Sequence, residues 1–144
     1  MSGNPLTFLG PVDGKRVLLW GVGLEAVGFA IAGADVYGFD RSASRVETVK
    51  DLARTLELRE QTHLQTMTIE QLAYPDDFFD LAFGQAASED ADLEVGAREL
   101  SRVMKPGGRG AFIVPAGAPA ERLVQRAFGS SVRSESWIGV EKTG

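Results

Sequence analysis

The sequence predicts an α/β fold: a doubly wound, mostly parallel sheet of six to seven strands with helices on both faces. Short apolar runs alternate with segments of helical length along all 144 residues, and this alternation is typical of βαβ units that build an open parallel sheet. No internal repeat, low-complexity tract or linker interrupts the pattern. We therefore expect a single domain over residues 1–144. Residues 1–14 carry three glycines and two prolines and are expected to be an irregular lead-in.

The first two strands are predicted by apolar runs on either side of a small-residue helix. Residues 16–20 (RVLLW) contain a continuous apolar run, as in a strand buried on both faces of a parallel sheet. Residues 26–32 are small and apolar enough for a helix packed on that strand, and Gly33 stands where a glycine commonly ends a helix. Residues 35–39 (DVYGF) predict the second strand, which ends at Asp40.

The next helix and strand follow from a capping residue and a helical period. Ser42 or Ser44 can cap a helix. Apolar residues then recur on one helical face, at Val46, Val49, Leu52, Ala53 and Leu56. Residues 62–68 are a weaker, more polar strand candidate.

The second half of the chain repeats the alternation. Residues 79–83 (FDLAF) predict a buried strand, and residues 91–104 predict a helix that the following Lys-Pro-Gly-Gly sequence ends. Residues 110–114 predict a strand and residues 118–128 a helix. The tail, residues 132–142, holds one strand or a tight hairpin, which leaves the strand count at six or seven.

Composition excludes several classes of function. The chain has 15 basic and 20 acidic residues, a net charge of −5 that repels phosphate backbones, so we expect no nucleic-acid partner. Cysteine is absent and His63 is the only histidine, which excludes thiolate and histidine-rich metal sites and a cysteine nucleophile. No apolar run of membrane-spanning length and no signal-peptide pattern is present, so we expect a cytoplasmic protein that uses no membrane.

A glycine turn after the first strand points to a ligand. Gly21 and Gly23 let the backbone turn sharply at the carboxyl end of the strand, where ligands bind in such sheets. Asp40 ends the second strand 17 residues after Gly23 and is placed to accept hydrogen bonds from ribose hydroxyls. The ligand is a dinucleotide, with Ala26 in the third glycine position, or another adenosyl compound. Alternatively, the glycines only make a tight turn and Asp40 only caps the next helix.

Four segments in order resemble the class I S-adenosylmethionine-dependent methyltransferases. LAYPDDFFDLAF (72–83) is similar to that family's loop and fourth strand, and ELSRVMKPGGRGAFI (99–113) to its helix and fifth strand. VLLWGVG (17–23) and DVYGFDRS (35–42) are similar to its first and second strands. The resemblance implies a Rossmann-like methyltransferase fold that binds S-adenosylmethionine and releases S-adenosylhomocysteine.

The resemblance also implies a role for six residues. Gly21 and Gly23 would lie against the methionine and ribose parts of the cofactor, and Asp40 would bind the ribose hydroxyls. The remaining three would lie at the adenine edge (Arg41), at the adenine amino group (Thr68), and near the sulfonium and the acceptor (Gly84). The resemblance names no catalytic residue and no metal ligand.

Three positions depart from the family pattern. Leu19 stands where the first strand commonly has an acid, Glu25 stands where a third glycine is common, and Thr68 replaces a frequent Asp. The chain also has no segment of the length of a lid, so a second copy, a partner subunit, the N-terminus or the substrate would have to cover the site. Two functions follow: methyl transfer to a small-molecule acceptor, or a catalytically degenerate binding or partner subunit.

Overall fold

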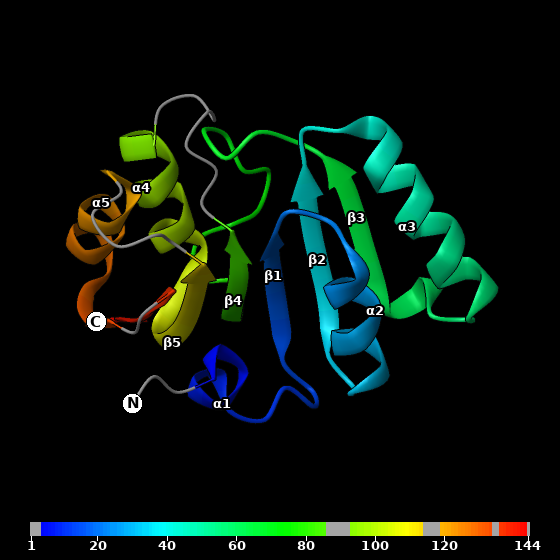
Figure 1. Cartoon of the computed structure of the whole chain (residues 1–144), viewed down its shortest axis with the longest axis horizontal. Coiled ribbons are helices and arrows are strands. Elements are labelled where there is room, and N and C mark those ends of the chain that lie inside the picture. Colours follow the sequence, from blue (N-terminus) through cyan, green and yellow to red (C-terminus); the bar gives the residue numbers. More distant parts are fainter. Residues whose placement is uncertain (1–3, 86–92, 114–118, 134–135, 144) are drawn as a thin grey trace.

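A seven-stranded sheet organises the chain, as expected. The computed structural model describes residues 4–85, 93–113, 119–133 and 136–143. The strand order is β3-β2-β1-β4-β5-β7-β6, and Figure 1 shows the first five of these strands side by side. Strand β7 runs antiparallel to both β5 and β6, while the other pairs are parallel. The strands are β1 (Arg16–Trp20), β2 (Asp35–Asp40), β3 (Thr62–Thr66), β4 (Phe79–Gln85), β5 (Met104–Ile113), β6 (Gly129–Arg133) and β7 (Trp137–Lys142).

Helices cover both faces of this sheet. Because successive side chains of a strand point to opposite faces, Val17 and Leu19 pack with α2 (Leu24–Ile31) and α3 (Ala43–Thr55). Leu18 and Trp20 face the other core, which holds α4 (Leu93–Val103) and α5 (Pro119–Phe128). Within the described residues, no helix is both long and apolar enough to cross a membrane.

The lead-in is more ordered than the sequence predicts. Residues 5–9, expected to be irregular, form the short helix α1 (Pro5–Leu9), and the Asn4 side chain caps it by accepting a hydrogen bond from Leu6 N–H. The ring of Phe8 lies 5.7 Å from that of Trp137 in β7. It fills the space left by Gly139, where a Cβ would lie 2.8 Å from the ring. This docking on β7 orders a segment whose composition alone indicates a loop.

Some helices and strands begin or end at other residues than the sequence predicts. The helix predicted over 26–32 begins at Leu24, directly after the glycine turn, and β3 ends at Thr66 instead of residue 68. The Lys-Pro-Gly-Gly sequence does follow the end of α4, but it lies inside β5, where pairing with β4 shifts register. The tail is a hairpin of β6 and β7. The predicted boundary residues Ala91, Val114 and Ala118 fall outside the described residues.

A loop, and no α-helix, connects β3 to β4, and aromatic side chains hold it on the sheet. The ring of Tyr74 lies 5.0 Å from that of Phe79 and 6.0 Å from that of Tyr37. The ring of Phe78 lies 5.4 Å from that of Tyr37. Burial, with a smaller contribution from Tyr37, raises the pKa of Tyr74 to about 12, so its phenol stays neutral.

Arg102 of α4 clamps the same loop to the helix. Its guanidinium donates to Leu72 O at 3.0 Å and Tyr74 O at 2.9 Å, and it pairs with Asp76 at 2.8 Å. Glu99 holds the guanidinium at 2.8 Å and accepts from Leu72 N–H at 3.0 Å. The hydrogen bond from Arg102 outweighs burial and lowers the pKa of Glu99, so both partners are charged. The planar guanidinium of Arg102 thus holds the backbone of the loop at both Leu72 and Tyr74.

Replacing Arg102 by Lys keeps the charge but removes the fork of donors. We expect the free energy of unfolding to fall by about 1.5–3 kcal/mol, because the partly buried carbonyls of Leu72 and Tyr74 lose a charged donor. Urea denaturation measures this change. Arg54→Lys on the exposed side of α3, where Arg54 pairs with Asp51 at 2.7 Å, is the matched control and should cost less than about 0.5 kcal/mol. Equal losses for the two variants would contradict the clamp.

Candidate functional site

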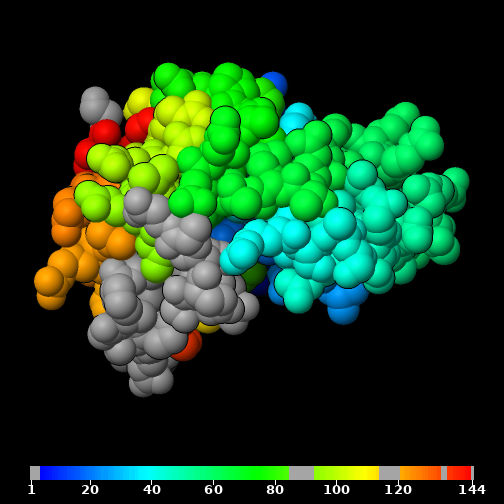
Figure 2. Space-filling view, turned by 90° about the horizontal axis from the view of Figure 1, so that it is seen from above, coloured from blue at the N-terminus to red at the C-terminus, as the bar shows by residue number. Residues whose placement is uncertain are grey.

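The candidate site lies at the carboxyl edge of the parallel strands. In this sheet Trp20, the last residue of β1, pairs with Phe39 of β2 and with Gly84 of β4. Asp40 pairs with Thr66, the last residue of β3. Parallel register therefore brings the ends of four strands to one edge, as open α/β sheets do at their ligand sites. Figure 2 views this edge from above, with the segment after β2 in cyan beside the segment after β3 in green.

The backbone of the glycine turn favours glycine at one position, Gly21. Gly21 has φ of 101°, in the left-handed region that other residues rarely adopt. Its N–H donates to Phe39 O at 2.9 Å, so the turn stays attached to β2. Gly23 is the N-cap of α2 and accepts from Ala26 N–H at 3.1 Å. Ala26 itself is fully buried against the sheet.

Asp40 joins the glycine turn to the start of α3. Its carboxylate accepts from Val22 N–H and from Ser42 N–H, both at 2.9 Å, and pairs with Arg45 at 3.2 Å. Only 9% of Asp40 is exposed. Burial would raise its pKa, but the hydrogen bonds from Val22 and Ser42, together with Arg45, outweigh burial and lower it. The group is a charged acceptor held at the edge of the sheet.

Arg45 is the residue that the sequence prediction missed. Its guanidinium lies on Asp40, while 62% of the Arg45 side chain is exposed. The available signal was position: Arg45 stands five residues after Asp40, in the first turn of α3. A carboxylate offers about four acceptor positions, so the three donors from Val22, Ser42 and Arg45 leave about one open.

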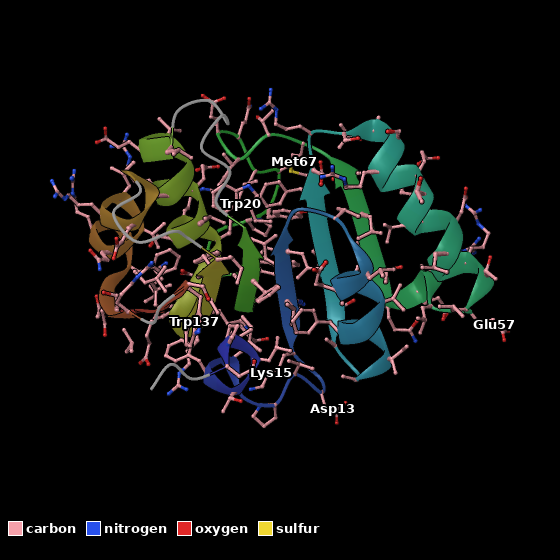
Figure 3. All side chains as sticks on the ribbon, in the orientation of Figure 1. Asp13, Lys15, Trp20, Glu57, Met67 and Trp137 are labelled. Carbon is pink, nitrogen blue, oxygen red and sulfur yellow. The ribbon has the colours of Figure 1, made fainter. Side chains whose placement is uncertain are left out.

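Arg41 and Thr68 are both exposed beside Asp40. Arg41 directly follows the end of β2, and Thr68 stands two residues beyond β3. Met67 N–H donates to Asp40 O at 3.0 Å, which extends the contact between the two segments past the last strand pair. Figure 3 shows Trp20 and Met67 at this same end of the sheet.

Gly84 has a packing reason to be glycine. A Cβ at this position would lie 2.5 Å from Trp20 O and 2.6 Å from Trp20 Cβ. Strand β4 could not approach β1 with a larger residue there. Packing therefore explains this glycine independently of any ligand contact.

Two residues that depart from the family pattern, Leu19 near the end of β1 and Glu25 at the start of α2, lie on either side of the glycine turn and have different surroundings. Leu19 is 1% exposed and belongs to the core under α2 and α3, so it presents no polar group to the edge. Glu25 is exposed and its Oε1 lies 2.7 Å from the position that a Cβ of Gly23 would take. The carboxylate of Glu25 therefore bends back over the turn. Negative charge is present at the turn, but it comes from α2 and not from β1.

Comparison with known proteins finds similarity to methyltransferases. A family model described as a methyltransferase domain matches residues 19–112. A 2-phytyl-1,4-naphtoquinone methyltransferase from Synechococcus elongatus is 37% identical over 79 residues, which are 54% of this chain and 34% of the relative. The chain therefore spans about a third of that relative's length.

Solved structures share the fold at low identity. A SAM-dependent methyltransferase from Aquifex aeolicus has a TM-score of 0.73 and 21% identity, covering 94% of this chain and 85% of that one. The geranyl diphosphate C-methyltransferase from Streptomyces coelicolor, solved with S-adenosyl-L-homocysteine, has a TM-score of 0.71 and 19% identity, covering 86% of this chain and 54% of that one.

The strand order, with its single antiparallel hairpin at β7 and β6, defines a Rossmann-like α/β protein of the methyltransferase type. The family model covers well over half of the residues. The chain belongs to the class I S-adenosylmethionine-dependent methyltransferase family, whose members use S-adenosylmethionine as cofactor. The resemblance seen in the sequence is confirmed, and the dinucleotide alternative is not supported.

Asp40→Asn tests the charged acceptor. A carboxylate whose pKa is lowered by folding stabilises the protein above its ordinary pKa of about 3.9, and this stabilisation is lost as pH falls through the lowered value. We expect Asp40→Asn to reduce the free energy of unfolding by about 1.5–3 kcal/mol at pH 7, where charged hydrogen bonds are lost. The difference from the unmodified protein should shrink steadily below pH 4 in urea titrations.

Asp51→Asn, on the exposed side of α3, is the control for this pH series and should leave the profile nearly unchanged. A difference between Asp40→Asn and the unmodified protein that stays constant down to pH 2 would rule out the charge of Asp40 as its cause.

Proposed function

We propose that this chain binds S-adenosylmethionine at the carboxyl edge of the sheet and transfers its methyl group to a small-molecule acceptor. One observation carries the proposal: a buried, charged carboxylate, Asp40, is held against the glycine turn of β1 by Val22 N–H. The proposed cofactor contacts are Gly21, Gly23, Asp40, Arg41, Thr68 and Gly84.

The geometry suits an adenosyl ligand on one condition. A ribose diol donates two hydrogen bonds, whereas Asp40 has about one acceptor position open. Arg45 is the partner that can leave, because its side chain is largely exposed while Val22 and Ser42 donate from the backbone. Once Arg45 moves away, the carboxylate can accept both hydroxyls without any change in the main chain.

Little acid–base machinery is required of the protein. The cofactor supplies a methyl group already activated on positive sulfur. The chain's part is to align donor and acceptor and to exclude water. The glycine turn lets the ligand come close to the protein backbone. The hydroxyl of Thr68 can accept a hydrogen bond from the adenine amino group, and Glu25 adds negative charge beside a cationic ligand.

The acceptor is proposed as a small molecule. The named relatives act on a phytyl-naphthoquinone and on geranyl diphosphate, two small molecules that each carry an isoprenoid chain but differ in the group attached to it. Cover for the reacting groups would come from a second copy or a partner subunit. A cytoplasmic setting, without nucleic acid or membrane, stays part of the proposal and rests on the net charge of −5 and the composition.

A second function is favoured by Leu19. This buried leucine replaces the acid that family members commonly place before the glycine turn, and Thr68 replaces another charged contact. A chain with a weakened site could serve as a ligand-binding or partner subunit without catalysis. Binding without turnover, in the presence of candidate acceptors, separates this function from methyl transfer.

Calorimetry with S-adenosylmethionine and S-adenosylhomocysteine tests the cofactor site directly. We expect one site per chain with a dissociation constant in the micromolar to low millimolar range, or about −8 to −4 kcal/mol. Asp40→Ala should weaken binding about tenfold to hundredfold, since a charged acceptor is lost. If neither ligand binds at millimolar concentration, the proposal fails for the isolated chain.

Arg45→Gln provides a test with the opposite sign. Because Arg45 competes with the ribose for Asp40, its removal should tighten binding of S-adenosylhomocysteine about twofold to fivefold, the value of an exposed ion pair. Lys50→Gln, further along α3 and paired with Glu47, is the control and should leave the affinity unchanged. Weaker binding by Arg45→Gln would show that Arg45 contacts the ligand and does not compete with it.

A further inference from the structure

We propose that the opposite edge of the sheet carries a second ligand site, which binds a small phosphate-bearing anion through Lys15, Lys105 and Arg109. A cleft of about 410 Å³ opens there between the end of α1, the residue before β1, and the first residues of β4 and β5. Its volume lies in the range of small-molecule sites. This inference does not rest on the proposed methyl transfer.

The cleft lies at the amino ends of the strands, far from the carboxyl edge where the cofactor is proposed to bind. Lys15 immediately precedes β1, and Asp80 is the second residue of β4, so both mark the amino ends of the strands. Figure 3 shows Lys15 at the foot of β1 near α1, at the end of the sheet opposite to Trp20 and Met67. A ligand in this cleft would leave Asp40 and the glycine turn accessible.

The lining carries an excess of positive charge. Three cations, Lys15, Lys105 and Arg109, share it with one carboxylate, Asp80. Asp80 pairs with Lys105 at 3.0 Å and accepts from Arg16 N–H at 2.9 Å. Burial alone would raise the pKa of Asp80, but these contacts and the charge of Lys15 lower it. Asp80 thus pairs with Lys105, and Glu141 pairs with Arg109, so Lys15 is the cation of the lining that has no ion pair within the described residues.

The other two cations differ in how firmly they are held. Arg109 donates to Phe8 O at 3.1 Å, lies over the Phe8 ring at 5.3 Å, and reaches Glu141 at 3.4 Å. These contacts fix the guanidinium beside the cleft. Lys15 is exposed, and no ion pair within the described part of the chain includes it. In a chain of net charge −5, this local cluster is unusual and attracts anions.

The wall of the cleft is a glycine bulge that leaves room for a ligand. Pairing of β5 with β4 moves from Met104 opposite Phe79 to Arg109 opposite Leu81, so residues 105–108 bulge out of the ladder. Gly107 has φ of 82°, and a Cβ there would meet nothing within 4 Å. Lysine and arginine side chains around an open glycine segment are a suitable combination for phosphate oxygens.

Titration of the full chain with pyrophosphate, at constant ionic strength, tests the site. We expect saturable chemical-shift changes at the backbone amides of Gly107 and Gly108, with a dissociation constant in the millimolar range. Lys15→Gln should weaken binding about fivefold, as for loss of one exposed ion pair, and Lys15→Glu should weaken it further. Lys50→Gln on α3 has the same change in charge and should leave the affinity unchanged. Because Lys15 is exposed, these variants are expected to fold.

Several outcomes would overturn the inference. They are the absence of saturation at Gly107 and Gly108, equal affinities for Lys15→Gln and the unmodified protein, and equal losses for the Lys15 and Lys50 variants, which would indicate diffuse screening. Saturating S-adenosylhomocysteine should leave the pyrophosphate titration unchanged. Suppression by that ligand would instead locate the anion at the glycine turn. Tighter binding of a sugar phosphate than of pyrophosphate would support the site and identify an organic phosphate as its ligand.

Discussion

The hydrogen bonds between Asp40 and the backbone of Val22 and Ser42 hold the carboxyl edge of the sheet together. They connect the turn after β1 to the turn after β2, and so fix two loops relative to one another. An unpaired charge at this depth would be strongly unfavourable, so the loops and the carboxylate stabilise each other. The same group is the proposed acceptor for a ribose. Folding stability and ligand affinity therefore depend on one carboxylate, and a bound ligand would raise the stability of the whole chain.

Much of the fold followed from the sequence because periodic and positional signals agreed. The apolar run of β1, the glycines after it, and the Ser42 cap of α3 each had one dominant local explanation. The parallel register that brings Asp40 beside Gly21 is a consequence of the fold class itself, so the position of that acid could be inferred. The resemblance of residues 99–113 then decided between two kinds of adenosyl ligand.

What could not be predicted depended on contacts between distant residues. The helix at Pro5–Leu9 exists because Phe8 fills the space over Gly139, and no local pattern encodes that partner. The pairing of Arg45 with Asp40 depends on how the first turn of α3 leaves the sheet. The cleft beside Lys15 arises from a register shift between β4 and β5, which composition does not reveal.

The docking of Phe8 against Gly139 and Trp137 also bears on how the protein assembles during synthesis. These contacts join residues separated by almost the whole described chain, so they close late and contribute strongly to contact order. Until a ribosome has produced β7, the ring of Phe8 lacks its contacts with Trp137 and Gly139, and the β5 edge that β7 later covers stays unpaired. The nascent chain would thus expose an apolar ring and an open strand edge until β7 emerges, and a chaperone that covers them would act during that interval.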